Sequence, residues 1–314
     1  MMTFIDFFSG IGGFRRGMEL AGHKCVGHCE IDKYADASYR SMHTITEEQR
    51  EYLAALTLKQ RQKEILKGEY LNGEWFADDI RRVYSDDIPR ADCWCFGFPC
   101  QDISPLKGKR LGLQGSSSSL FFRIMYLLGQ IRDEEKPGWL FIENVKNLLR
   151  INDGWDFARL LVEMDLGGYD AQWQTLNSKE FGVPQNRERV FVVGNYRGQG
   201  RREIFPICTY DNKTPILQVA EWDVERKNSN NYRIYSPKGV APTLTATTGG
   251  GKNARVIIGK NIRMLTPKEY FRLQGWSDDY FNKAAFVNSD AQLYKQAGNG
   301  VTVNVIYEIA KRMK

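Results

Sequence analysis

Gly97-Phe98-Pro99-Cys100-Gln101 follows directly on an apolar, strand-like run from Ala91 to Phe96. Ligands of open α/β sheets collect at the carboxyl ends of strands, so this Pro-Cys step places a thiol where a substrate would bind. A free cysteine is more often an inert, buried hydrophobe, and the neighbouring motifs must decide between the two interpretations. The next residues, 102–119, are polar and contain three glycines and four consecutive serines, and we expect them to close over the substrate.

Three other stretches carry reactive or charged residues next to strand-like runs. Asp6 to Phe14 is a glycine-rich turn, Glu143-Asn144-Val145 holds an acid, and Gln185-Asn186-Arg187-Glu188-Arg189 is basic. The dinucleotide fingerprint requires a third glycine where this turn has Arg15, so the spacing excludes an NAD site. Alternating strands and helices over residues 1–194 indicate an α/β fold on a mainly parallel sheet.

In this order, the four stretches resemble the cytosine-C5 DNA methyltransferase family of bacterial or phage type. The resemblance covers nearly the whole chain and fades only over about 44–74 and 195–235. It implies a Rossmann-like, S-adenosylmethionine-dependent methyltransferase fold, a mixed α/β sheet flanked by helices, with a small irregular target-recognition domain. The implied domains are a discontinuous catalytic and cofactor-binding domain (1–194 and 286–314), a target-recognition domain (195–262), and a hinge with a structural helix (263–285).

The resemblance also implies S-adenosyl-L-methionine as the cofactor and S-adenosyl-L-homocysteine as its product. In the family, the residue matching Phe14 lies against the adenine, the acid matching Glu30 binds the ribose hydroxyls, and Asp79 matches the acceptor of the adenine amino group. The cofactor-binding residues implied are Phe7, Ser9, Gly10, Gly12, Gly13, Phe14, Glu30, Ile31, Asp79, Ile80, Pro99 and Asn299. We expect no metal, because Cys93-Trp94-Cys95 has no matching Cys/His pair.

The chemistry that the resemblance implies is covalent. A thiolate that adds to C6 of cytosine makes C5 an enamine-like carbon, which can attack a methyl sulfonium. The family match assigns the thiolate to Cys100, the hydrogen bond to N3 and the exocyclic amine to Glu143, and the hydrogen bond to O2 to Arg189. It makes Arg187 the residue that orients Glu143.

Duplex DNA is the substrate implied, and the target base must leave the stack to react. Residues 195–262 hold 11 Lys or Arg against 5 Asp or Glu, which equals the +6 surplus of the whole chain. On charge alone this segment is equally a phosphate-contacting surface or an ordinary solvated basic surface. Ser116 to Ser119 depart from the charged residue common in the family. The DNA-binding residues implied are Gln101, Ser104, Lys107, Lys109, Arg110, Asn230, Asn231, Arg233 and Thr243.

Local patterns predict further elements. Residues 46–67 read as one long polar helix that starts with a Thr46–Gln49 capping box, an insertion without assigned chemistry. A strand is expected from Trp139 to Ile142, with Glu143 at its end. Residues 241–245 read as a short strand, and 301–313 as the C-terminal helix.

Other functions were weighed against this one. An RNA (tRNA) cytosine-C5 methyltransferase on the same scaffold is the alternative, which residues 195–262 disfavour because they hold few aromatics for base stacking. A zinc deaminase needs a second cysteine where Ile103 stands. A non-catalytic DNA-binding module would need neither Cys100 nor the glycine turn. The sequence has no long apolar run and no signal peptide, which predicts a cytoplasmic protein without a membrane segment. A monomer is the default expectation, and whether a separate cognate restriction endonuclease accompanies the enzyme stays open.

Overall fold

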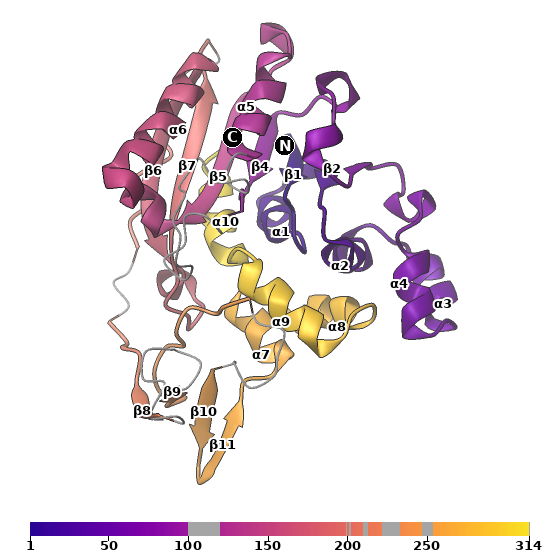
Figure 1. Ribbon diagram of the computed structural model, residues 1–314, viewed down its shortest axis with the longest axis vertical. Coiled ribbons are helices and arrows are strands. Elements are labelled where there is room, and N and C mark those ends of the chain that lie inside the picture. Colours follow the sequence, from indigo (N-terminus) through magenta and orange to yellow (C-terminus); the bar gives the residue numbers. More distant parts are fainter. Residues whose placement is uncertain are drawn as a thin grey trace.

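The computed structural model of the 314-residue chain describes residues 1–99, 120–198, 200, 202–209, 213–221, 233–246 and 254–313. Seven strands of this described part form a central sheet in the order β3-β2-β1-β4-β5-β7-β6 (Figure 1). They are β1 (Thr3–Phe7), β2 (Lys24–Cys29), β3 (Trp75–Ala77), β4 (Cys93–Phe96), β5 (Trp139–Val145), β6 (Tyr169–Asn177) and β7 (Glu188–Tyr196).

The sheet is mixed, as predicted. Strands β3, β2, β1, β4 and β5 are parallel, whereas β7 pairs antiparallel with both β5 and β6. The antiparallel partner carries β5 past its expected end, because Glu143, Asn144 and Val145 pair with Phe191, Val190 and Arg189. Glu143 therefore lies inside the strand and not after it.

Helices cover both faces of the sheet. Helices α5 (Leu120–Gly129) and α6 (Trp155–Leu166) share one hydrophobic core with Ile5 and Phe96. Helices α1 (Gly13–Leu20) and α10 (Val303–Ala310) share a second core with Phe4 and Phe141 on the opposite face. The C-terminal helix is shorter than the predicted 301–313, since its first residue, Val303, follows Thr302 as N-cap.

The predicted helix over 46–67 is wrong in one respect. The Thr46–Gln49 capping box is present and begins α3 (Glu47–Ala54). Thr57 then adopts an extended backbone, its N–H donates to the Gln60 side chain at 3.0 Å, and a second helix, α4 (Leu58–Glu64), begins. A second N-cap residue therefore divides the insertion into two helices.

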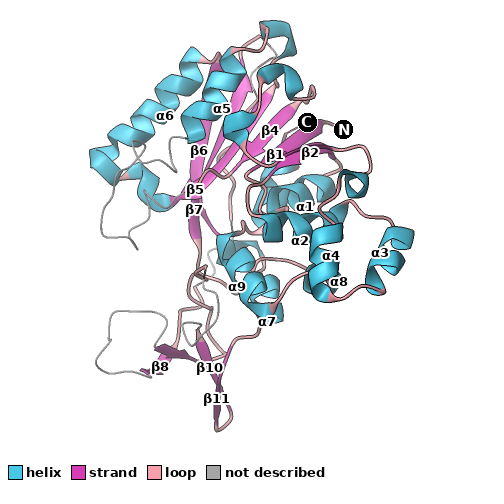
Figure 2. Cartoon of the chain, turned by 45° about the vertical axis from the view of Figure 1, so that its right-hand side comes forward, coloured by secondary structure: helices cyan, strands magenta, loops and turns pink. Residues whose placement is uncertain are grey.

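A four-stranded sheet lies apart from the central one, below it in Figure 2. It consists of β8 (Gln218–Glu221), β9 (Arg233–Tyr235), β10 (Arg255–Ile258) and β11 (Asn261–Met264). The strand expected over 241–245 is wrong, because only an isolated bridge joins Ala241 to Gln185. Pro242 has no N–H to continue a ladder.

Helices α7 (Pro267–Leu273), α8 (Asp278–Ala285) and α9 (Asp290–Asn299) lead from β11 back to α10, and α2 (Lys33–His43) packs against α8 and α9. Helix α7 starts with the predicted capping box, in which Thr266 accepts a hydrogen bond from the N–H of Glu269. Ile11, Met42 and Leu244 belong to the same hydrophobic core as Phe271 and Leu293 of these helices. The glycine turn, α2 and the chain beside the small sheet thus meet in one packed region.

Candidate active site

The site begins at the carboxyl ends of four parallel strands. The glycine loop, defined here as residues 8–13, follows β1, and Glu30 follows β2. Gly97 follows β4, and Glu143 lies near the end of β5. Because parallel strands point their carboxyl ends to the same edge of the sheet, these residues gather there.

Glu143 lies directly beside the chain that leads to Pro99. A Cβ atom on Gly97 would be 3.3 Å from Oε2 of Glu143, so the glycine leaves space for the carboxyl group. The side chain of Asn144 donates a hydrogen bond to the carbonyl of Phe98 at 3.1 Å. These contacts hold the predicted acid next to the segment that carries the predicted nucleophile, although Cys100 itself lies outside the described residues.

Arg189 is the ion-pair partner of Glu143. Its Nε lies 3.1 Å from Oε1 of Glu143, and the two side chains are only 16% and 11% exposed. Burial raises the pKa of Glu143 above its ordinary value, and the charges of Arg189 and Arg187 oppose this rise. A carboxyl group with a raised pKa stays protonated to a higher pH and can donate a hydrogen bond to a ring nitrogen.

Arg187 lies differently from its neighbour. It is buried, and its guanidinium donates to the carbonyls of Leu244 (3.3 Å), Gly298 (3.3 Å) and Gly300 (2.7 Å). Its charge lowers the pKa of Glu143. The structure therefore gives Arg187 a second task, that of joining three chain segments, while its orienting role stays a prediction.

The glycine loop surrounds the carboxylate of Glu30. One carboxylate oxygen accepts the N–H of Gly10 and the other that of Asp32, both at 2.7 Å. Burial raises the pKa of Glu30. Gly10 and Gly12 have φ of +56° and +85°, in the left-handed region that favours glycine. The loop and the acid that sequence reasoning paired are thus in direct contact.

The remaining predicted cofactor residues differ in exposure. Phe14 packs edge-on against Phe141, and Phe7 is fully buried beside Trp94, so Phe7 has only its backbone to offer a ligand. Ile31 is 65% exposed. The others are distributed as follows: Ser9, Asp79 and Ile80 are buried, Gly12 and Gly13 lie in the loop, Pro99 follows β4, and Asn299 is exposed at the end of α9.

Asp79 already holds a partner. Its carboxylate accepts the backbone N–H of Arg81 at 3.0 Å and pairs with the guanidinium of Arg81 at 2.7 Å, which lowers its pKa. The lowered pKa favours the ionised form, in which both oxygens can only accept hydrogen bonds, as suits an amino-group donor. Arg81 is largely exposed, so the ion pair is weak and the guanidinium can give way to another donor.

Two of the predicted DNA-binding residues lie in the described chain. The hydroxyl of Thr243 donates to the carbonyl of Asn186 at 2.7 Å, which ties residues near the small sheet to the basic motif. Arg233 begins β9 and is partly buried. Outside the described residues lie Gln101, Ser104, Lys107, Lys109, Arg110, Asn230 and Asn231.

Sequence reasoning quoted Gln185 as the first residue of the basic motif but missed the buried polar cluster that it forms with Gln274. Gln185 donates to the carbonyl of Leu273 at 2.8 Å and accepts the N–H of Leu244 at 3.1 Å. Gln274 donates to the carbonyl of Ala297 at 2.7 Å and accepts the hydroxyl of Thr302 at 2.8 Å. These glutamines carry no local signal, because every partner is distant in sequence.

A mixed sheet with a glycine loop after β1, an acid after β2 and a buried acid beside the β4 loop defines a class of protein. The class is the Rossmann-like α/β fold, in which ligands lie at the carboxyl ends of the parallel strands. Among the described residues, no group of His, Cys, Asp and Glu could hold a metal ion. No helix in the same part of the chain is long and apolar enough to cross a membrane.

The comparisons identify the family within this class. The model of the C-5 cytosine-specific DNA methylase family matches residues 2–68, 51–233 and 197–314. The Type II methyltransferase M.HhaI of Haemophilus parahaemolyticus is 31% identical, over 98% of this chain and 93% of that protein. M.NlaX of Neisseria lactamica is also 31% identical, over 100% and 96%. The chain belongs to the C-5 cytosine-specific DNA methylase family, and the prediction of a DNA cytosine-C5 methyltransferase is confirmed.

Solved structures agree on the fold. The Dnmt2 methyltransferase of S. pombe aligns with a TM-score of 0.66 at 17% identity, covering 99% of this chain and 98% of that one. A putative DNA modification methyltransferase from an E. coli prophage aligns with a TM-score of 0.61 at 17% identity, covering 100% and 98%. At this identity the likeness concerns the fold alone, and it confirms the predicted fold class.

Proposed function

We propose that this chain methylates C5 of a cytosine turned out of duplex DNA, through a covalent bond between Sγ of Cys100 and C6 of the base. The observation that carries the proposal is the position of Glu143. It lies against Gly97 and is followed by Asn144, which clamps Phe98 two residues before Cys100. An acid held beside the loop that carries the thiol fits a reaction in which the thiol attacks C6 of the cytosine and the acid protonates N3.

The glycine loop supports S-adenosyl-L-methionine as the cofactor. Each oxygen of Glu30 accepts one backbone N–H and keeps a lone pair for a ribose hydroxyl. The hydroxyl of Ser9 is buried without a hydrogen-bond partner among the described residues, which suits a group that meets a ligand. The space beside Gly10 is open, because no described heavy atom lies within 4 Å of the position that a Cβ atom would take, and this leaves room for a ligand.

In this proposal the residues divide the work as follows. The thiolate of Cys100 adds to C6, while Glu143 hydrogen-bonds N3 and the amine as charge moves into the ring. Arg189, through its partly exposed guanidinium, hydrogen-bonds O2. When bound, S-adenosyl-L-methionine supplies an electrophilic methyl group for C5 and leaves as S-adenosyl-L-homocysteine. Loss of the C5 proton then allows the thiolate to be eliminated from C6, which regenerates free Cys100.

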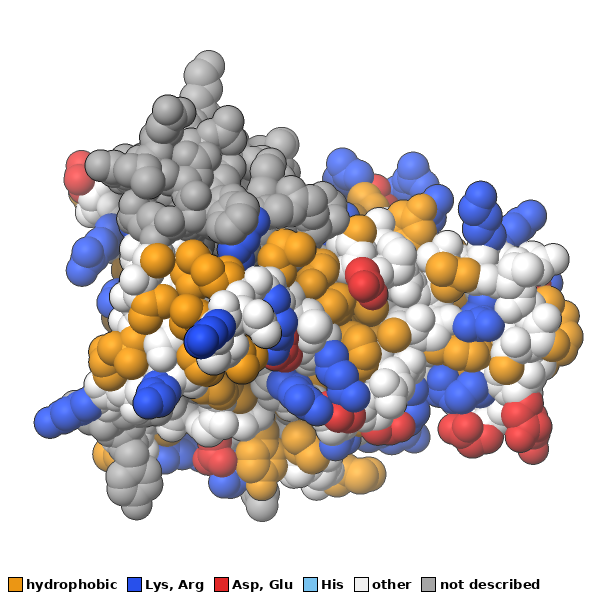
Figure 3. All heavy atoms as spheres, turned by 90° about the horizontal axis from the view of Figure 1, so that it is seen from below, with side chains coloured by type: hydrophobic (Ala, Val, Ile, Leu, Met, Phe, Trp, Pro, Cys, Tyr) orange, Lys and Arg blue, Asp and Glu red, His pale blue; other side chains and the backbone are white. Residues whose placement is uncertain are grey.

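We assign DNA docking to residues 195–262, which carry the chain's basic surplus. Seen from below, Lys and Arg side chains are scattered between hydrophobic patches, with some Asp and Glu side chains among them (Figure 3). The strands β8 to β11 support the division into catalytic (1–194, 286–314), target-recognition (195–262) and hinge (263–285) regions, although β11 ends two residues later, at Met264.

The test is methyl transfer from S-adenosyl-L-methionine to duplex DNA, with RNA offered in parallel and sequencing that locates the methylated cytosine. We expect C5 methylation within one short DNA motif. The Cys100→Ser variant should lose methylation while it keeps specific DNA binding, because the hydroxyl is a much weaker nucleophile. Full activity of that variant, or methylation of RNA alone, would contradict the proposal.

We further propose that the enzyme acts as a cytoplasmic monomer and protects its motif from a separate restriction endonuclease. Several relatives are named Type II methyltransferases, which supports this assignment. Light scattering should give the mass of one chain in solution. DNA methylated at the mapped motif should resist an endonuclease that cuts that motif, and cleavage of fully methylated DNA would count against the protective role.

A further inference from the structure

His43 is the last residue of α2 and lies against the glycine loop. Its Nε2 is 3.1 Å from the carbonyl oxygen of Ile11. A carbonyl only accepts hydrogen bonds, so Nε2 must carry the proton. Its Nδ1 atom is buried and has no hydrogen-bond partner among the described residues. The imidazole therefore donates its one hydrogen bond to the glycine loop.

The ring also fits the shape of the loop. A Cβ atom on Gly12 would lie 2.5 Å from Nε2 of His43 and 3.1 Å from Cε2 of Tyr39. Gly12 has a φ of +85°, so the position excludes a side chain for conformational reasons as well. The histidine thus holds this backbone in two ways: it donates a hydrogen bond to the carbonyl of Ile11, and its ring packs against Gly12.

The other edges of the ring meet aromatic side chains. The ring centroid of His43 lies 5.0 Å from that of Tyr39, 6.0 Å from that of Trp276 and 5.4 Å from that of Tyr280. Trp276 follows α7, and Tyr280 lies in α8, which packs against α2. The guanidinium of Arg16, itself close to the glycine loop, lies 4.6 Å from the Tyr280 ring.

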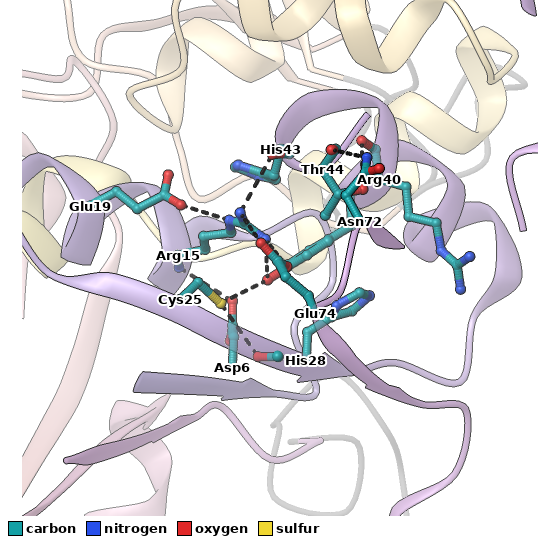
Figure 4. A network of polar contacts seen from close by, with 12 residues as sticks. Asp6, Arg15, Glu19, Cys25, His28, Arg40, His43, Thr44, Asn72 and Glu74 are labelled. Carbon is teal, nitrogen blue, oxygen red and sulfur yellow. Dashed lines mark hydrogen bonds and ion pairs between the residues drawn. The ribbon is translucent and has the colours of Figure 1, made fainter. Parts of the chain in front are cut away.

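Arg15 fixes the backbone behind the imidazole (Figure 4). Its guanidinium donates to the carbonyl of His43 at 3.4 Å and to both carboxylate oxygens of Glu74 at 2.6 and 2.7 Å. It also bonds Glu19 at 2.8 Å. Burial, followed by the charge of Arg15, holds the pKa of His43 well below its ordinary value, which keeps the ring in the neutral, single-donor form.

We propose that His43 is a positioning residue for the cofactor: its Nε2–H holds the Ile11–Gly12 backbone in the conformation that binds S-adenosyl-L-methionine, and its ring anchors that backbone to Trp276 and Tyr280. The inference rests on the cofactor site of the proposed function. It names a residue outside the four sequence motifs, and it makes cofactor affinity depend on a side chain that does not touch the cofactor.

The test compares three substitutions of His43 in the full-length chain. His43→Phe keeps the ring contacts and removes the donor. His43→Gln places an amide N–H near the position of Nε2, whereas His43→Asn places one near the position of Nδ1, too far back to reach Ile11. We measure the Kd for S-adenosyl-L-methionine by titration calorimetry, together with kcat at saturating cofactor and the thermal midpoint.

We expect His43→Phe and His43→Asn to weaken cofactor binding by about tenfold, the equivalent of one lost hydrogen bond, and His43→Gln to stay within about threefold of the natural chain. The kcat at saturation should change by less than about twofold in all three. A purely structural role would lower the thermal midpoint and the fraction of active enzyme but leave the Kd of the folded fraction unchanged.

His23→Phe is the matched control. The Nε2 of His23 lies 3.2 Å from the carbonyl of Ala310, next to the start of β1 and so at the other end of that strand from the glycine loop. This variant should bind the cofactor normally. Unchanged affinity in His43→Phe, or equal losses in His43→Gln and His43→Asn, would overturn the inference. No cofactor binding by the natural chain would instead overturn the proposed function, so the two failures are distinguishable.

Discussion

A single methyl group at Gly97 should disturb catalysis without disturbing the fold. In Gly97→Ala the new Cβ would lie 3.3 Å from Oε2 of Glu143, 3.7 Å from its carbonyl oxygen and 3.8 Å from Cε2 of Phe14. Only the first contact is tighter than ordinary van der Waals distance, so the carboxyl group must retreat by a few tenths of an ångström. Misplacement of a reacting group by 1 Å can cost about a hundredfold in rate. We therefore expect kcat to fall by about fourfold to tenfold.

The assay is single-turnover methyl transfer at saturating DNA and cofactor, with the denaturation midpoint recorded in parallel. Gly68→Ala is the control, since no heavy atom of the described chain lies within 4 Å of its would-be Cβ and its φ is not positive. Gly68→Ala should match the natural chain in rate. An unchanged rate in Gly97→Ala would refute the claim that the carboxyl position matters. A large fall in stability would show that the added methyl group disturbs the core and not Glu143.

Two further predictions concern carboxyl groups. Glu143→Gln should lower the single-turnover rate by about 10²- to 10⁴-fold with DNA and cofactor affinities nearly unchanged, because it removes an acid and leaves the shape; a change confined to cofactor affinity would show that Glu143 has another role. The ion pair with Arg263 lowers the pKa of Glu269 from 4.5 to about 2. The stabilisation that this ion pair gives the folded chain is complete above pH 4.5 and is lost as pH falls towards 2. Arg263→Met should therefore reduce the change in unfolding free energy over this pH range, measured by urea unfolding. An equally steep pH dependence in the variant would contradict the assignment.

The first half of the site was predictable because its signals are local. The glycine turn after an apolar run and the acid at the end of the next strand could be recognised in the sequence, whereas the resemblance supplied the ribose role of Glu30. Parallel neighbours then bring the two residues to one edge of the sheet. The structure adds only the hydrogen bond between the Gly10 N–H and the Glu30 carboxylate.

Other elements failed where one residue outweighed the general pattern. The polar run over 46–67 has helical composition throughout, yet Thr57 with Gln60 provides a second N-terminus and divides it. At 241–245 the residues suit a strand, but Pro242 removes a donor. Glu143 fell inside β5 because an antiparallel neighbour, invisible in the strand's own sequence, extends the pairing to Val145.

The polar cluster and His43 were beyond reach for a different reason. Gln185 and Gln274 bond to groups that lie far along the chain, such as Leu273, Leu244 and Ala297. His43 contacts Ile11 and Tyr280 from the end of a helix whose pattern says nothing about either. Such contacts depend on how helices pack against loops, which is settled by tertiary structure and not by local propensity.

Burial separates two arginines that the sequence could not separate by itself. Arg187 and Arg189 stand two residues apart in one basic motif, and only the family resemblance assigned the base to Arg189 and the orientation of Glu143 to Arg187. Arg187 is 3% exposed and donates to three backbone carbonyls, so it has no access to a substrate and cannot leave its partners cheaply. The Arg189 side chain is 16% exposed and pairs with the predicted acid. Burial therefore supports the proposal that Arg189 contacts the base, whereas Arg187 joins Leu244 to Gly298 and Gly300 at the end of α9.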